Sequence, residues 1–185
     1  MCFPSAECGL PGICHLSFSD FAKDSACPES LIPDPCYALT MKCRHGSYEY
    51  FDHAADIGVH AEADSIENLF FTCAEALLHW IGEPPDEPTE VCLDVSVESQ
   101  DLEGLLVSWL QKLLFLFQDR LLYTSRFLEI DLKDTKLKGS VMARVWNQSS
   151  HENFREVKAV TYHQLRVTRE GELWGAEIIL HLSEN

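Results

Sequence analysis

The sequence has no run of about 20 apolar residues, the length that a helix needs to cross a lipid bilayer. It also has no basic segment followed by an apolar segment near residue 1, so a secretory signal peptide is not expected. We therefore expect a cytoplasmic protein that has no contact with a membrane.

Basic residues are scarce as well. Lys and Arg together number 14 against 30 Asp and Glu, which gives a formal net charge of −16 and a pI near 4.7. A surface of this sign repels a phosphate backbone, so any contact with RNA is expected to be indirect. Two interpretations of the charge remain open: ordinary solubility, or a surface that meets a basic partner or collects cations.

Several signatures of enzymes and metal sites are missing. The sequence has no GxSxG nucleophile turn, no GxxxxGK[ST] phosphate loop, no HExxH zinc helix and no glycine-rich dinucleotide turn. Six of its eight cysteines fall within the first 43 residues at irregular spacing, and none forms a CxxC pair. An autonomous enzyme is thereby disfavoured, and free thiols are expected in place of disulfides or a zinc site.

The chain of 185 residues, 46% of them hydrophobic, is long enough for one domain with a substantial core. Residues 1–40 contain scattered Pro, Ser, Cys and Gly without apolar periodicity, which predicts a disordered, cysteine-rich extension. Met41 precedes the regular part of the sequence and is a candidate for the natural start of translation. Residues 41–185 are expected to form the domain.

Apolar periodicity predicts two helices. The first begins after Asp64 or Ser65, spans residues 66–81 and ends at Gly82, and the second begins near Asp101 and reaches residue 117. Alternating patterns predict strands at 48–51, 57–62, 91–97, 127–132, 137–145, 157–163, 165–168 and 173–182. Without regular βαβ alternation, this order indicates an α+β fold in which two helices pack on one mostly antiparallel or mixed sheet.

Three short stretches contain residues capable of chemistry. The string Asp52-His53-Ala54-Ala55-Asp56 combines carboxylates with an imidazole, which suits a divalent cation. An alternative is that both aspartates cap a turn while His53 bonds to the backbone.

The second stretch spans residues 156–163, where strict alternation places Lys158 and Val160 on one face and Val157 and His163 on the other. The third is His181 within an apolar strand. Such a histidine is most often part of the core, and it becomes a candidate ligand if Asp56 lies beside it.

Taken together and in this order, residues 48–58, 101–110 and 157–163 resemble the archease family. The resemblance covers about residues 47–182. It implies an α+β fold and a non-catalytic role as cofactor of a GTP- and Mn²⁺-dependent RNA ligase of the RtcB type, in tRNA splicing or RNA repair. In that role the protein would promote guanylylation of the ligase and multiple turnover.

The resemblance also implies a metal site. Its ligands would be Asp56, the main-chain carbonyl of Leu182, and the residue at position 181, where this sequence has His181 and the family commonly has Asp. Loss of one carboxylate is expected to weaken Ca²⁺ and to favour Mn²⁺ or Zn²⁺ in comparison. Ca²⁺ and Mn²⁺ are the expected ions, with Zn²⁺ as an alternative.

Four further residues of the matched blocks are candidates for supporting the site or facing the ligase: Asp52, His53, Lys158 and His163. Two rival functions remain open. One is a metal-dependent hydrolase or phosphodiesterase in which His53, Asp56, His163 and His181 hold an ion that activates water. The other is a general chaperone-like modulator.

Overall fold

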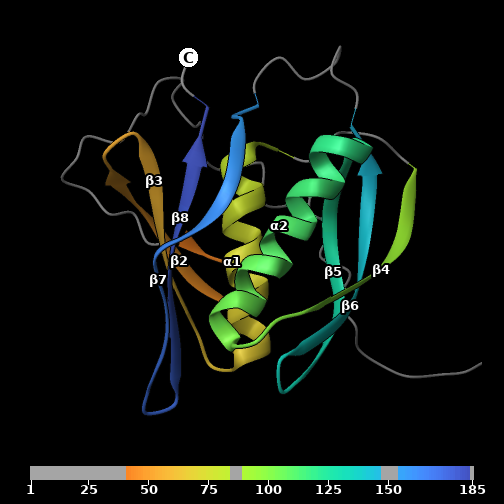
Figure 1. Ribbon diagram of the computed structural model, residues 1–185. Coiled ribbons are helices and arrows are strands. Elements are labelled where there is room, and N and C mark those ends of the chain that lie inside the picture. Colours follow the sequence, from red (N-terminus) through yellow and green to blue (C-terminus); the bar gives the residue numbers. More distant parts are fainter. Residues whose placement is uncertain (1–40, 84–88, 147–153, 184–185) are drawn as a thin grey trace, which may run out of the picture. The chain divides into compact units, whose positions relative to one another are not determined.

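The computed structural model describes residues 41–83, 89–146 and 154–183. The predicted extension 1–40 lies outside these residues. The described residues form two helices and eight strands in the following order: β1 Met41–Lys42, β2 Gly46–His53, β3 Asp56–Ala63, α1 Ile66–Ile81, β4 Glu90–Glu98, α2 Leu102–Arg120, β5 Leu122–Lys133, β6 Lys136–Val145, β7 Val157–Glu170 and β8 Leu173–Leu182 (Figure 1).

The strands form two antiparallel sheets, and the helices lie between them (Figure 1). One sheet has five strands in the order β1-β2-β3-β8-β7, and the other has three in the order β4-β6-β5. The predicted α+β class is confirmed, but the expectation of one sheet is wrong. Alternation within a strand shows which of its faces is buried, whereas the choice of neighbouring strand depends on distant residues.

Helix α1 has the predicted bounds. The Ser65 hydroxyl caps its first turn by accepting the Asn68 amide N–H at 3.2 Å, and the amide of Gly82 closes its last turn on Leu78. Side chains around most of its circumference are buried, which is the burial expected of a helix placed between two layers.

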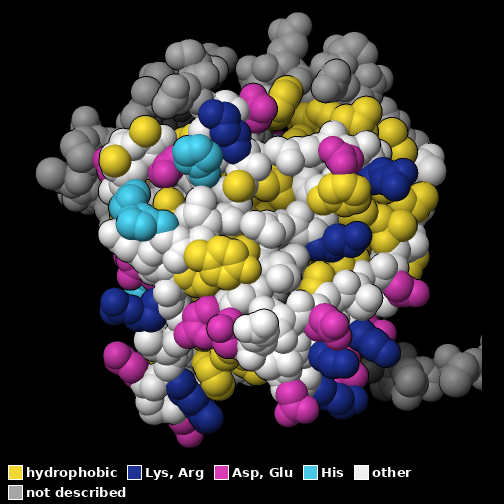
Figure 2. Space-filling model, in the orientation of Figure 1, with side chains coloured by type: hydrophobic (Ala, Val, Ile, Leu, Met, Phe, Trp, Pro, Cys, Tyr) yellow, Lys and Arg dark blue, Asp and Glu magenta, His cyan; other side chains and the backbone are white. Residues whose placement is uncertain are grey.

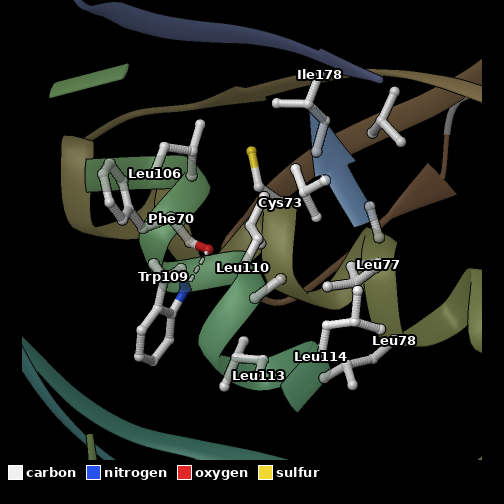
Figure 3. Close-up of a cluster of buried hydrophobic side chains, with 14 of the residues drawn as sticks. Phe70, Cys73, Leu77, Leu78, Leu106, Trp109, Leu110, Leu113, Leu114 and Ile178 are labelled. Carbon is white, nitrogen blue, oxygen red and sulfur yellow. Dashed lines mark hydrogen bonds between the residues drawn. The ribbon is translucent and has the colours of Figure 1, made fainter. Parts of the chain in front are cut away.

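Helix α2 begins after Asp101, whose carboxylate accepts the Gly104 amide N–H at 2.7 Å. It ends at Leu121 in the left-handed region, with φ of 52°. Trp109 lies fully buried in the centre of this helix and donates its indole N–H to the Phe70 carbonyl of α1 at 3.3 Å (Figure 3). This bond joins the two helices inside an otherwise apolar cluster.

Strand β7 differs from its prediction. The expected strands 157–163 and 165–168 form one strand with two irregularities against β8, one between Val157 and Ala159 and one between Thr161 and Arg166. Val157 and Val160 are both 1% exposed, although strict alternation places them on opposite faces. The first irregularity shifts the alternation by one residue, so the predicted division of faces is wrong.

No helix within the described residues is long and apolar enough to span a membrane. Cys43, Cys73 and Cys92 are free thiols, as predicted for them. Burial raises the pKa of the fully buried Cys73 thiol, so this cysteine serves as a small apolar core residue.

Candidate functional site

Asp56 stands at the turn between β2 and β3. The turn reverses at Ala54, whose φ of 51° is left-handed, and it pairs His53 with Asp56 across the hairpin. Residues opposite each other in an antiparallel pair point to the same face of the sheet. Tyr50, three residues before His53, points to the other face and donates its hydroxyl hydrogen to the Ala76 carbonyl of α1. His53 and Asp56 therefore face away from the helices.

His181 meets Asp56 because β8 is the next strand of the sheet. The register pairs Ile57 with Leu180, and the following step along the two strands brings His181 to Asp56. The His181 Nδ1 atom lies 2.8 Å from Asp56 Oδ1, and the Leu182 backbone N–H donates to the same oxygen at 3.2 Å. His181 is exposed and beside Asp56, so it is not a core histidine.

This contact shows how Asp56 is held. Its carboxylate accepts hydrogen bonds from β8, 125 and 126 residues along the chain, and so acts as a bridge between strands rather than as the cap of its own turn. The alternative of a turn-capping Asp56 is therefore not what the structure shows.

His53 and His163 form a second contact beside the first. Their rings pack edge to face with centroids 5.4 Å apart, and His53 Nδ1 is buried without a hydrogen-bond partner among the described residues. The alternative in which His53 bonds to a backbone group is thus not realised at this nitrogen. His163 itself is exposed.

Lys158 lies in the first irregularity of β7. Its neighbours Val157 and Ala159 pair with Leu182 and His181, so the exposed Lys158 is the extra residue beside the end of β8. Asp52 is exposed, but strand alternation directs it to the face opposite His53 and Asp56.

The end of the five-stranded sheet thus gathers residues from three distant segments. Figure 2 shows histidine side chains at the surface in the upper left of the view, on the side occupied by the five-stranded sheet in Figure 1. Acidic and basic side chains are mixed over the rest of this face (Figure 2). The sheet order β2-β3-β8-β7 therefore places the first and last motifs of the domain side by side.

Asp56 and His181 provide a carboxylate oxygen and an imidazole nitrogen, which are donor types that divalent cations bind. With Nδ1 directed at the Asp56 carboxylate, the nitrogen of His181 that can bind a cation is Nε2. A carboxylate that holds one ring nitrogen of a histidine is the arrangement that orients metal-binding imidazoles in proteins. The assignment of the proton to Nδ1 follows from this hydrogen bond.

The side chains do not form a larger cluster. Within residues 41–83, 89–146 and 154–183, no three His, Cys, Asp or Glu side chains lie close enough together to hold a metal ion. His53 and His163 pair with each other, and Asp56 pairs with His181. The four-residue metal centre required by the hydrolase hypothesis is not assembled in this arrangement.

Sequence reasoning missed two structural features of the site. One is the second irregularity of β7, in which residues 162–165 lie opposite a single residue of β8. The other is the Phe51 ring, which lies over Gly58. A glycine in an alternating strand indicates a close approach of this kind, and it is the only hint that the sequence offers.

Comparison with known proteins identifies the class. Residues 48–182 match the model of the Archease protein family (MTH1598/TM1083). This match covers most of the chain, and the chain belongs to the archease family.

Individual relatives agree with that assignment. The chain is 34% identical to the Protein archease of Pyrococcus furiosus over 137 residues, which cover 71% of this chain and 96% of that protein. It is 29% identical to the Protein archease-like of Drosophila melanogaster, over 72% of this chain and 87% of that protein.

Two solved structures share the fold. The solution structure of Methanobacterium thermoautotrophicum protein 1598 superimposes with a TM-score of 0.58 at 32% identity, over 73% of this chain and 98% of that one. A crystal structure of an archease, possible chaperone, from Thermotoga maritima gives a TM-score of 0.50 at 19% identity, over 71% and 94%. The second match supports the fold alone.

Proposed function

We propose that this protein is a non-catalytic cofactor of a GTP- and Mn²⁺-dependent RNA ligase of the RtcB type, acting in tRNA splicing or RNA repair. Membership of the archease family supports this role. The observation that carries the proposal to particular residues is the convergence of Asp56 and His181 at one end of the five-stranded sheet. RNA would be reached only through the ligase, because the net charge of −16 opposes direct binding of a polyanion.

In this proposal Asp56, His181 and the Leu182 carbonyl would hold a divalent ion, Ca²⁺ or Mn²⁺, with Zn²⁺ as the alternative favoured by the imidazole. When bound, the ion supplies concentrated positive charge at the surface that the ligase meets. The carboxylate of Asp56 orients the His181 ring, and the Leu182 N–H fixes the carboxylate. These contacts hold Asp56 and His181 together in the absence of an ion; for both side chains to bind one ion, the hydrogen bond at Nδ1 would have to open, because Nε2 lies on the far side of the ring.

The residues around this site would meet the ligase or support the site. Lys158 is exposed beside the end of β8 and can pair with an acidic group of a partner. Asp52 is exposed on the opposite face of the sheet and would meet the ligase only from that side, while His53 and His163 stand with Asp56 on the outer face. None of these side chains needs to form a covalent bond in the proposed role.

A chaperone-like action is the second candidate. The Thermotoga maritima structure is described as that of a possible chaperone. Such an activity would depend on exposed apolar side chains, among them Tyr162, which is 63% exposed, and Leu128, which is 52% exposed. Suppression of aggregation of an unrelated unfolded protein would favour this candidate over a dedicated ligase cofactor.

The test is multiple-turnover RNA ligation by the cognate ligase with GTP and limiting Mn²⁺. Wild type is compared with Asp56→Ala and with Asp119→Ala, a control that removes an exposed carboxylate near the end of α2. We expect stimulation by wild type and by Asp119→Ala, and loss of at least about tenfold in Asp56→Ala, since truncation leaves the β8 donors without their acceptor. Equal stimulation by all three proteins would exclude Asp56 from the mechanism.

A further inference from the structure

The outer face of the five-stranded sheet contains a contact between strands that are not neighbours. His53 belongs to β2 and His163 to β7, and β3 and β8 lie between them in the sheet. Three strand spacings amount to about 14 Å. The two rings nevertheless pack with their centroids 5.4 Å apart. A regular β7 would not bring its side chain to that position, so the local shape of the strand must account for the contact.

The second irregularity of β7 provides this shape. Thr161 pairs with Ile179 and Arg166 pairs with Glu177, so four residues, 162–165, stand opposite Ile178 alone. Three surplus residues therefore leave the ladder. At their base the Thr161 hydroxyl donates to the Ile179 carbonyl at 3.5 Å, and the His163 amide N–H donates to the same hydroxyl at 3.3 Å. The bulge is thus fixed to β8 by a side chain of its own strand.

The bulge also contains a costly backbone conformation. Gln164 has φ of 53°, in the left-handed region that residues with a Cβ rarely adopt. Residues held in such conformations cluster at functional sites, where the surrounding structure compensates for the strain. The residue before it, His163, is the one whose ring packs on His53.

His53 contacts both the bulge of β7, through His163, and the turn that carries Asp56. It pairs with Asp56 across the β2–β3 turn, and its Nδ1 is buried without a hydrogen bond among the described residues. No hydrogen bond therefore holds the ring from that nitrogen, and the His163 ring is the aromatic group that packs against it.

We propose that His163, presented by the bulge of β7, is a positioning residue that holds the His53 ring and thereby the turn bearing Asp56 in the arrangement that the ligase partner meets. This inference rests on the proposed function and assigns His163 to support rather than to direct contact. Lys158, which makes no such contact with His53, remains the candidate for contact with the partner. The support requires an aromatic ring at position 163, not an imidazole nitrogen.

The experiment compares His163→Ser, His163→Phe and His60→Ser with wild type. His60→Ser is the matched control, because His60 is a partly exposed histidine of β3 on the same outer face and its Nε2 lies 3.7 Å from Glu62 Oε1. The first measurement is the set of imidazole ring signals of His53 in NMR spectra. We expect the lines to broaden in His163→Ser, because the His53 ring loses the ring that packs on it, and to stay as narrow as in wild type in His163→Phe and His60→Ser; chemical shifts change whenever the neighbouring ring is replaced, so the line width is the criterion.

The second measurement is the concentration of each variant that gives half-maximal stimulation of ligation. Loss of an aromatic pair predicts a rise of about two- to tenfold in His163→Ser. His163→Phe should return to within about twofold of wild type, with maximal stimulation unchanged. Melting temperatures measured in parallel should agree among the variants, which separates positioning from unfolding.

Three results would overturn the proposal: unchanged His53 line widths in His163→Ser, an unchanged half-stimulating concentration in that variant, or failure of His163→Phe to restore that concentration. The last result would mean that an imidazole nitrogen acts directly. Absence of stimulation by wild type would refute the proposed function instead, and the NMR comparison would then decide alone whether His163 positions His53.

Discussion

The Phe51 ring lies over Gly58 on the face of the sheet that presents Asp56, and this contact makes a sharp prediction. Gly58 is buried in β3, and a Cβ built on it would overlap the Phe51 ring. The obstacle is the half-buried Phe51 ring, which relieves the overlap only by changing its χ1 rotamer and giving up its packing over the main chain. We expect Gly58→Ala to be destabilising through overpacking, although alanine is otherwise tolerated in strands.

The expected loss of stability in Gly58→Ala is the usual cost of overpacking. Overpacking in a well-packed region costs about 1–3 kcal/mol of the free energy of unfolding. For a domain of this size each kcal/mol lowers the melting temperature by about 2–4 °C, so a fall of about 2–12 °C is expected. Urea unfolding followed by circular dichroism gives the free energy by linear extrapolation, and an unchanged m-value would show that the surface exposed on unfolding is the same in both proteins.

Two further variants test whether the Phe51 ring causes the loss of stability. Gly175→Ala in β8 is the control, because the added Cβ would meet the Thr168 hydroxyl oxygen at 3.2 Å, a contact that a small adjustment relieves. In a Phe51→Ala background the cost of Gly58→Ala should nearly vanish, since the ring that it strikes is gone. A Gly58→Ala protein within about 0.5 kcal/mol of wild type, or a cost that persists without Phe51, would refute the assigned contact.

Two other predictions concern charged groups. The Arg126 guanidinium is bonded to Glu90 at 2.6 Å and holds the pKa of the Glu90 carboxyl below its usual range. The ion pair therefore stabilises the fold above the pKa that Glu90 has in the unfolded chain. This stabilisation is lost as the pH falls through the lower pKa that Glu90 has in the folded protein. Glu90→Gln should therefore cost about 1 kcal/mol at pH 7 and less below about pH 4, as measured by urea unfolding at both pH values. His181→Asp should tighten Ca²⁺ binding about tenfold or more in calorimetric titration, because a second carboxylate joins Asp56, whereas the charge-matched control His60→Asp should not.

The fold was predictable where local rules act alone. Helix α1 has the predicted bounds because Ser65 caps it and its apolar spacing is regular, and Asp101 begins α2 for the same reason. Strand β7 was divided into two because its bulge interrupts alternation, and the sequence gives no measure of how many residues leave a ladder. The division into two sheets was missed because strand pairing depends on residues far apart in the chain.

The candidate site was predictable in composition but not in geometry. Asp56 and His181 were singled out by residue type and by resemblance, and their contact depends on β3 and β8 being neighbours. No periodicity in the chain reveals that adjacency. The contact between His53 and His163 could not be predicted from the sequence, because it depends on both the strand order of the sheet and the bulge in β7. The sequence identified His163 as a candidate, but it did not predict which way the His163 side chain points.

The backbone explains how position 181 can change without dismantling the site. Asp56 accepts one hydrogen bond from the main-chain N–H of Leu182, and any residue at position 181 leaves that donor in place. The register of β3 on β8 sets the donor's position, and that register is fixed by buried residues such as Ile57 and Leu180. A substitution at position 181 therefore changes the charge beside Asp56, while Asp56 keeps its hydrogen bond from the Leu182 backbone N–H. The placement of Asp56 therefore does not depend on the side chain at position 181 alone.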